Sequence, residues 1–198
     1  MARSPAPAIV APLGPVVTER LELRRFEAAD LDGLAAVFAR PEVWAFPYGR
    51  AFTREETADF LDAQIEAWDE YGFGCWIARL RQTPEPIGYV GLSVPTFLPE
   101  ILPAVEVGWR FHPDHWGRGL ATEGARAALR EGFTTLGLSE ICSLPQSTNP
   151  PSSRVCERLG MSFRRTVQCS PTDRRGSVEA RMYVTAAAEW VGQTAAAG

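Results

Sequence analysis

A glycine-rich turn between a predicted strand and a predicted helix constrains the fold more than any other feature of the 198-residue sequence. The strand ends at Phe111, and Gly117 and Gly119 come just before a helical pattern at residues 120–136. The first amides of a helix have no partner inside it, and the helix dipole is positive there, so this position attracts anions. Glycines let a phosphate approach the main chain, and Arg118 adds positive charge. The pattern favours a phosphate-binding loop over a turn that only joins two elements.

Two common phosphate-binding motifs do not match this loop. A dinucleotide fingerprint requires a third small residue where Thr122 stands, and it belongs to an early βαβ unit rather than to the second half of a chain. All 20 residues counted as Lys or Arg are arginine. The missing lysine excludes a Walker loop, a pyridoxal Schiff base and a lysine nucleophile. What remains is a phosphate-bearing cofactor bound at one helix end.

The remaining pattern predicts one α/β domain with mostly antiparallel hairpins rather than a doubly wound sheet. Residues 1–16 are expected to be a disordered or extended leader, residues 17–185 the domain, and residues 186–198 a C-terminal tail. A capping box at Thr53–Glu56 begins a helix that ends before Gly72. Further helices are expected at 31–38 and 152–159, and strands are expected at 20–26, 75–80, 87–94, 105–111, 140–144, 163–169 and 177–184.

Composition and charge exclude several classes of partner. The formal net charge of −4 gives no reason to expect nucleic acid or an anionic membrane. No apolar run reaches the roughly 18 residues of a membrane span, and prolines interrupt any signal peptide near the N-terminus. The four cysteines form no C-x-x-C pair and are expected to be reduced thiols in a cytoplasmic protein: Cys75, Cys142, Cys156 and Cys169.

Three segments resemble one enzyme family. Trp116–Ala121 resembles the acetyl-CoA pyrophosphate loop Q/R-x-x-G-x-G/A of the GNAT acetyltransferases, with Trp116 in place of the usual Gln or Arg and Ala121 at the small position. Asn149–Met161 is similar to the N-x-x-S…E-K-L-G-F segment of that family. Thr18–Arg24 resembles the opening strand of the RimJ/RimL-like branch, which acetylates protein N-termini. The matches come in the family's order and cover about residues 16–185.

The resemblance implies a fold and a set of cofactor contacts. The GNAT fold is a mixed, mostly antiparallel twisted sheet that splays into a V between its fourth and fifth strands, with about four flanking helices. Acetyl-CoA would lie in the V. The pantetheine arm and acetyl carbonyl would contact the main chain of Val107, Gly108, Trp109 and Phe111, with Asn149 and Ser152 near the arm and sulfur. The loop would hold the diphosphate through Trp116, Gly117, Arg118, Gly119, Leu120, Ala121 and Thr122.

Transfer of an acetyl group to an amine needs a base, because an ammonium ion cannot attack a thioester. Glu106 is the candidate, since it lies on the splayed strand where the family often carries a carboxylate; a purely structural carboxylate is the alternative. An amide near Trp109 would stabilise the oxyanion. The departing thiolate has a reference pKa of about 8.5, so a hydrogen bond from Ser152 would assist it.

Three further residues or groups have open roles. Cys156 stands where many family members carry a tyrosine acid, which leaves the general acid undecided; the residue type is more typical of a buried small hydrophobe. His112, Asp114 and His115 are poorly spaced for a metal, so no metal is expected. The aromatic residues of the loop at 41–52 are expected either to line the acceptor pocket or to pack on the sheet: Trp44, Phe46 and Tyr48.

The sequence thus predicts an acetyl-CoA-dependent N-acetyltransferase that acts by direct attack in a ternary complex. The acceptor is a primary amine, either a protein N-terminal α-amine or a small molecule. A non-catalytic acyl-CoA-binding or sensor module is the alternative: the absent tyrosine favours it, and Glu106 and Ser152 oppose it. The sequence leaves open whether the protein is a monomer or a homodimer.

Overall fold

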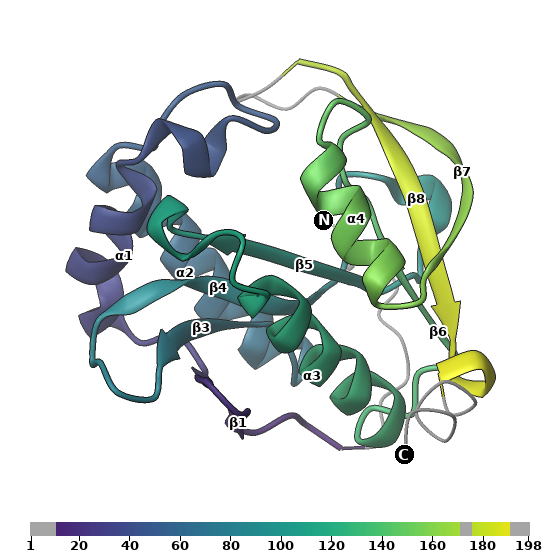
Figure 1. Cartoon of the computed structure of the whole chain (residues 1–198), viewed down its shortest axis with the longest axis horizontal. Helices are drawn as coiled ribbons and strands as arrows, with labels where there is room; N and C mark the ends of the chain where they lie inside the picture. Colours follow the sequence, from purple (N-terminus) through teal and green to yellow (C-terminus); the bar gives the residue numbers. More distant parts are fainter. Residues whose placement is uncertain (1–10, 171–175, 191–198) are drawn as a thin grey trace.

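One eight-stranded sheet organises the part of the chain that the computed structural model describes, residues 11–170 and 176–190. The strand order is β1-β2-β3-β4-β5-β6-β8-β7, and every paired neighbour is antiparallel except β5 and β6. Figure 1 shows the two halves of the sheet diverging beyond β5. The strands are β1 Val16–Val17, β2 Leu21–Arg24, β3 Cys75–Leu80, β4 Pro86–Ser93, β5 Glu106–Phe111, β6 Glu140–Ser143, β7 Ser162–Cys169 and β8 Val178–Ala186.

Four α-helices accompany the sheet within the described ranges, and residues 187–190 begin a further helical turn. The 3₁₀ segments η1 (Ala28–Asp30), η2 (Pro41–Trp44), η3 (Pro99–Ile101) and η4 (Pro113–His115) lie in the connections. The α-helices are α1 Leu31–Phe38, α2 Arg54–Tyr71, α3 Leu120–Thr134 and α4 Pro150–Arg158.

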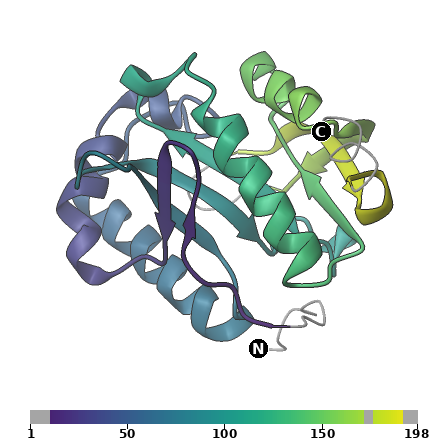
Figure 2. The same cartoon turned by 60° about the horizontal axis from the view of Figure 1, so that its bottom comes forward.

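The two faces of the sheet carry separate layers, as the alternation of side chains along a strand requires. On β3, Trp76 and Ala78 belong to the core beneath α3, whereas Cys75 and Ile77 belong to the aromatic core formed with α1 and α2. Figure 2 shows α3 in front of the strands and α2 behind them. This arrangement leaves the C-terminal end of β5 and the start of α3 at one edge of the molecule.

The predicted V between the fourth and fifth expected strands is confirmed. In the structure these two strands are β5 and β6, because the short strand β1 precedes them. The two strands share one register pair among the described residues, Glu106 with Cys142. Past this pair the strands separate, and the hydroxyl of Ser143 donates to the carbonyl of Val107 at 2.9 Å instead of a backbone amide. The gap between the strands therefore opens directly beside Glu106.

Helix α3 approaches the sheet closely because small residues face it. A Cβ added to Gly124 would lie 2.7 Å from Cγ1 of Val90, and one added to Gly132 would lie 2.5 Å from Cδ1 of Ile141. Ala125 and Ala128 are buried in the same interface. These small side chains allow α3 to pack closely on the sheet.

The predicted capping box of α2 is also present. The hydroxyl of Thr53 accepts from the amide of Glu56, and the carboxylate of Glu56 accepts from the amide of Thr53. At the other end, Gly72 takes a left-handed conformation with φ 72°, which glycine adopts without strain. Both ends of this long helix were therefore readable from the sequence.

The ends of the domain differ in part from the predicted leader and tail. Leu13 and Val16 are buried, and Nε1 of Trp76 donates to the carbonyl of Gly14 at 3.0 Å, so this stretch of the leader packs on the core. In the predicted tail, Trp190 is buried with its ring 6.0 Å from that of Phe133. Residues 1–10 and 191–198 lie outside the described residues. None of the described helices combines the length and apolar character that crossing a membrane requires.

We expect Gly124→Val to destabilise the fold, since the added methyl groups would overlap Val90 in a packed interface. Overpacking of this kind costs about 1–3 kcal/mol of unfolding free energy. Urea unfolding measures the change. Ala63→Val, at an exposed position on α2, is the control because it introduces a β-branched side chain into a helix; equal losses for the two variants would contradict the close contact.

Candidate functional site

The glycine-rich turn leaves a row of backbone amides without partners. Gly117 and Gly119 have φ of 70° and 79°, in the left-handed region that glycine enters freely. Within the described part of the chain, no hydrogen bond uses the amides of residues 117–122; Glu123 is the first to donate, to the carbonyl of Gly119 at 3.0 Å. Six free donors at the N-terminus of a 15-residue helix form an anion site.

A cavity of about 1400 Å³ lies against this turn. Its wall includes Phe111 and Trp109 from β5, the turn and first residues of α3, and Asn149 and Ser152 at the start of α4. Trp116 is 52 % exposed, and its Nε1 donates to the carbonyl of Phe111 at 2.7 Å, which holds the entrance of the turn against the strand. This volume exceeds the range of about 300–1,000 Å³ that is typical of ligand sites.

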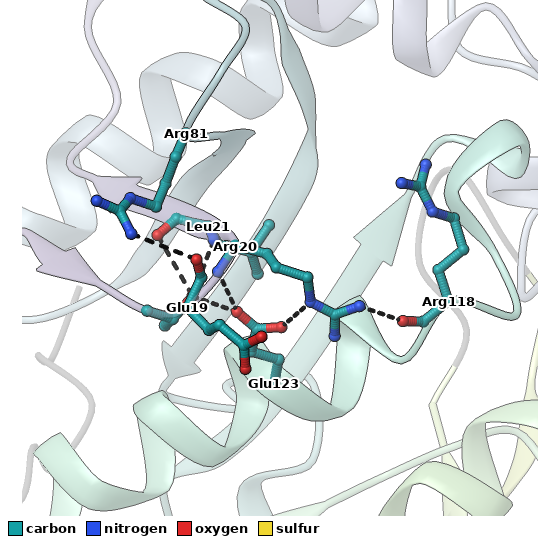
Figure 3. Close-up of polar contacts among 7 residues, drawn as sticks. Glu19, Arg20, Leu21, Arg81, Arg118 and Glu123 are labelled. Carbon is teal, nitrogen blue, oxygen red and sulfur yellow. Dashed lines mark hydrogen bonds and ion pairs between the residues drawn. The ribbon is translucent and has the colours of Figure 1, made fainter.

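Glu123 ties the turn to the start of the sheet (Figure 3). Its carboxylate accepts from the hydroxyl of Thr18 at 2.6 Å, from the amide of Arg20 at 2.8 Å and from Nε of Arg20 at 2.6 Å. Arg20 also donates to the carbonyl of Arg118 at 2.8 Å. Burial alone would raise the pKa of Glu123, but the hydrogen bonds from Thr18 and Arg20 outweigh burial and lower it.

A second cavity of about 660 Å³ contains Glu106. Burial raises the pKa of Glu106 to about 7, and a backbone hydrogen bond from Leu144 and the charge of Arg110 oppose the rise. A carboxyl group with this pKa is partly protonated near neutral pH and exchanges protons there. Glu106 is therefore equipped to accept a proton from a bound group.

The two cavities adjoin where β5 and β6 separate. Both are lined by residues from β5, from the loop after η2 and from the start of α4: Phe46, Trp109, Arg110, Asn149 and Ser152. Oδ1 of Asn149 accepts from the amide of Ser152 at 3.3 Å and so caps α4. The hydroxyl of Ser152 thus stands at the boundary between the free amides on one side and Glu106 on the other.

The family model described as "Acetyltransferase (GNAT) domain" matches residues 20–162. This chain belongs to the GNAT acetyltransferase family. The uncharacterized N-acetyltransferase YnaD of Bacillus subtilis (strain 168) is 41 % identical over 146 residues, which are 74 % of this chain and 81 % of YnaD. The uncharacterized protein YkkB of the same organism is 32 % identical over 154 residues, 77 % of this chain and 88 % of YkkB.

Solved structures agree with the fold. A GNAT-family acetyltransferase from Bacillus anthracis superposes with a TM-score of 0.73 at 25 % identity, covering 88 % of this chain and 99 % of that one. The ribosomal L7/L12 α-N-protein acetyltransferase RimL, solved in complex with coenzyme A, superposes with a TM-score of 0.68 at 14 % identity, covering 86 % of this chain and 96 % of that one. The RimL likeness shows the fold alone.

Most of the predicted GNAT cofactor residues lie together on the larger cavity, but three do not. Val107 is fully buried, and among the described residues it lines neither cavity. Arg118 is also absent from the described residues that line the larger cavity. Its guanidinium lies 3.3 Å from Nδ1 of His115, and its carbonyl accepts a hydrogen bond from Arg20. Gly108 lines the smaller cavity. Arg20, which the sequence pattern did not indicate, also lies beside the turn, where it pairs with Glu123.

The aromatic loop packs against the domain and also lines the smaller cavity, while its contact with an acceptor stays a prediction. Trp44 is only 3 % exposed. It stacks on Phe52 with ring centroids 3.8 Å apart, and the guanidinium of Arg110 lies 4.0 Å from its ring centroid. Trp44 also lines the smaller cavity together with Phe46 and Tyr48. Packing and lining are therefore combined in the same residues.

Cys156 and the two histidines have limited chemical roles. Cys156 is buried, lines neither cavity among the described residues, and has its pKa raised to about 12 by burial. His115 lines the larger cavity, and burial together with the charge of Arg118 lowers its pKa. Residues 11–170 and 176–190 contain no group of three or more His, Cys, Asp or Glu side chains placed to hold a metal.

Glu123→Gln should weaken the link between the turn and the β1–β2 hairpin. The folded state lowers the pKa of Glu123, so the ionised group stabilises the fold above its unfolded pKa of 4.5, and this contribution is lost as the pH falls through the lower folded pKa. We expect a loss of roughly 1–2 kcal/mol at pH 7, after discounting for the exposed Arg20. Urea unfolding at pH 7 and pH 3.5 measures it, with exposed Glu85→Gln as control. A loss that did not shrink at pH 3.5 would contradict this account.

Proposed function

We propose that this GNAT enzyme transfers the acetyl group of acetyl-CoA directly to a primary amine while both are bound. The observation that carries the proposal is the junction of the two cavities, with free amides on one side and Glu106 on the other. The acceptor is a protein N-terminal α-amine or a small-molecule amine.

The larger cavity fits coenzyme A. The unpartnered amides at residues 117–122 would hold its diphosphate, as helix N-termini hold phosphates elsewhere. The cavity continues from this turn past Trp109 to Ser152, which gives the pantetheine arm a path toward the V. Bound acetyl-CoA supplies an activated thioester carbonyl. Coenzyme A in the related RimL structure supports the same use of the fold.

Glu106 would prepare the acceptor. An amine enters mainly as an ammonium ion, and Glu106 takes its proton directly or through a water molecule. The free amine attacks the thioester carbonyl carbon and forms a carbon–nitrogen bond, and the carbon–sulfur bond then breaks with the electron pair going to sulfur. The nitrogen loses its second proton as the amide forms, and that proton converts the thiolate to the free thiol. A main-chain amide near Trp109 would stabilise the oxyanion, and the hydroxyl of Ser152 would donate a hydrogen bond to the leaving thiolate.

A non-catalytic acyl-CoA-binding module is the second candidate, and the missing tyrosine favours it. The position of Cys156 weakens that argument. Cys156 is buried and is not among the described residues that line either cavity, so a side chain in its place would not face the proposed site. A carboxyl group with a pKa of about 7 beside the cofactor cavity has no use in a simple binder.

Acetyl-CoA binding and acetyl transfer can be tested in sequence. Acetyl-CoA at 100 times its Kd should stabilise the native state by about 2.7 kcal/mol. For a chain of this size that corresponds to an increase in melting temperature of about 5–10 °C. Release of free thiol from acetyl-CoA, with a panel of N-terminal peptides and small amines, then measures transfer. Binding without amine-dependent thiol release would favour the binding module, and no binding would overturn both candidates.

Glu106→Gln should separate activity from stability. Loss of a general base lowers kcat/KM by roughly 10²–10⁴-fold, and wild-type activity should rise with pH through about 7 as Glu106 ionises. Stability should change in the opposite direction. A carboxyl whose pKa is raised by burial favours folding at low pH, and this contribution is lost as the pH rises through about 7. The glutamine variant should therefore be more stable than wild type at pH 8.5, by roughly 2 kcal/mol.

Glu140→Gln on neighbouring β6 is the matched control, since it removes an exposed carboxylate from an adjacent strand. It should leave the pH profile of thiol release unchanged. Full activity of Glu106→Gln at every pH would remove Glu106 from the role of base.

A further inference from the structure

Four arginines line one side of the larger cavity, beyond the glycine-rich turn. Arg126 and Arg130 stand four residues apart on α3, and Arg154 and Arg158 stand four residues apart on α4. Residues four apart share one face of a helix, so each helix presents a pair of like charges to the cavity. Such pairs destabilise a helix on their own. Their presence on two adjacent helices calls for a compensating anion.

These charges have few protein partners. Arg130 pairs with Glu131 at 3.2 Å. Arg126, Arg154 and Arg158 form no ion pair with any described residue. Nη2 of Arg126 instead donates to the carbonyl of Arg158 at 3.2 Å, which brings the two helices together at this point. The dipole of α4 accounts for Arg158 in its last turn but not for the other two.

Among the described residues, the acidic ones on the same cavity are Glu19, Glu42 and Glu123, and of these only Glu123 belongs to α3 or α4. Glu123 is paired with Arg20, and Glu42 is paired with Arg40, both near the turn and η2. Glu19 belongs to the same hairpin as Arg20 (Figure 3). On α4, Glu157 accepts from the hydroxyl of Tyr183 and is not among the cavity residues of the described chain. The wall made by α3 and α4 therefore keeps its positive charge.

The spacing suits a second phosphate of the same ligand. A helix rises 1.5 Å per residue, so Arg126 stands about 9 Å along α3 from Leu120 and the free amides. In coenzyme A, a phosphate monoester on the adenosine ribose follows the diphosphate. A phosphate monoester carries nearly two negative charges at neutral pH, and arginine is the side chain best suited to bind it.

We infer that Arg126, Arg154 and Arg158 form a binding site for the 3′-phosphate of coenzyme A, through which the protein selects acetyl-CoA over its dephosphorylated form. The inference rests on the proposed use of acetyl-CoA and adds a specificity that the glycine-rich turn alone does not provide. The turn would hold the diphosphate of either form equally well.

Calorimetric titration with acetyl-CoA and with acetyl-dephospho-CoA tests the site, and no acceptor is needed. At low salt, wild type should bind acetyl-CoA at least about tenfold more tightly, and the ratio should fall as salt rises. The triple variant R126Q/R154Q/R158Q, which keeps polar side chains at all three exposed positions, should reduce the ratio to below about twofold. Its melting temperature without ligand checks that it is folded.

The triple variant R54Q/R164Q/R165Q is the control. It makes the same change in net charge at exposed arginines that pair with Asp32, Glu140 and Glu100 and do not line the cavity. It should keep the wild-type ratio. Equal wild-type affinity for the two ligands, or an unchanged ratio in R126Q/R154Q/R158Q, would overturn the 3′-phosphate site while leaving the proposed acetyl transfer standing. Failure to bind either ligand would overturn the proposed function itself.

Discussion

Glu106 and Cys142 form the register pair that joins β5 to β6, and the amide of Cys142 donates to the carbonyl of Val105 at 2.9 Å. Beyond this point β5 has β4 on one side and, among the described strands, none on the other. Main-chain groups at an open strand edge need partners, so such an edge is suited to an extended ligand. The gap also brings Glu106 to the surface of a cavity while leaving it half-buried. One break in the sheet thus creates both an open strand edge beside a cavity and the raised pKa of Glu106.

The charges around the site are arranged in two different ways. The negative charge of Glu123 is compensated, because Thr18 and Arg20 donate hydrogen bonds to its carboxylate. These bonds also hold the turn against the hairpin. Glu106 is an acid whose charge is left under-compensated, because burial outweighs the opposing effects of Leu144 and Arg110. The first stabilises the fold and the second costs stability at alkaline pH. A site that must exchange a proton near neutral pH requires the second arrangement, and the rest of the domain must supply the stability it loses.

Local sequence patterns predicted the elements well, because caps, glycines and alternating side chains act over a few residues. The turn at Gly117 and Gly119, the capping box at Thr53 and the strand at Cys75–Leu80 all follow from such short-range rules. The link between Arg20 and Glu123 did not follow, since 103 positions separate the two residues and only the sheet brings them together. The packing of Trp44 was left undecided for the same reason: its stacking partner and Arg110 lie further along the chain.

The absence of a tyrosine acid also looks different once the site is assembled. Sequence comparison alone presents Cys156 as a defect in the catalytic set, whereas the structure places its thiol in the core with a pKa of about 12. The group that does reach the junction of the cavities is Ser152, on the first turn of α4. A thiolate has a reference pKa of only about 8.5, so it departs from a tetrahedral centre far more readily than an amine or alkoxide and needs hydrogen bonding rather than a strong acid. Ser152 lies in the first turn of α4, where the positive end of the helix dipole adds to this effect. In the proposed transfer, loss of the tyrosine would therefore remove a proton donor from a step that requires little proton donation.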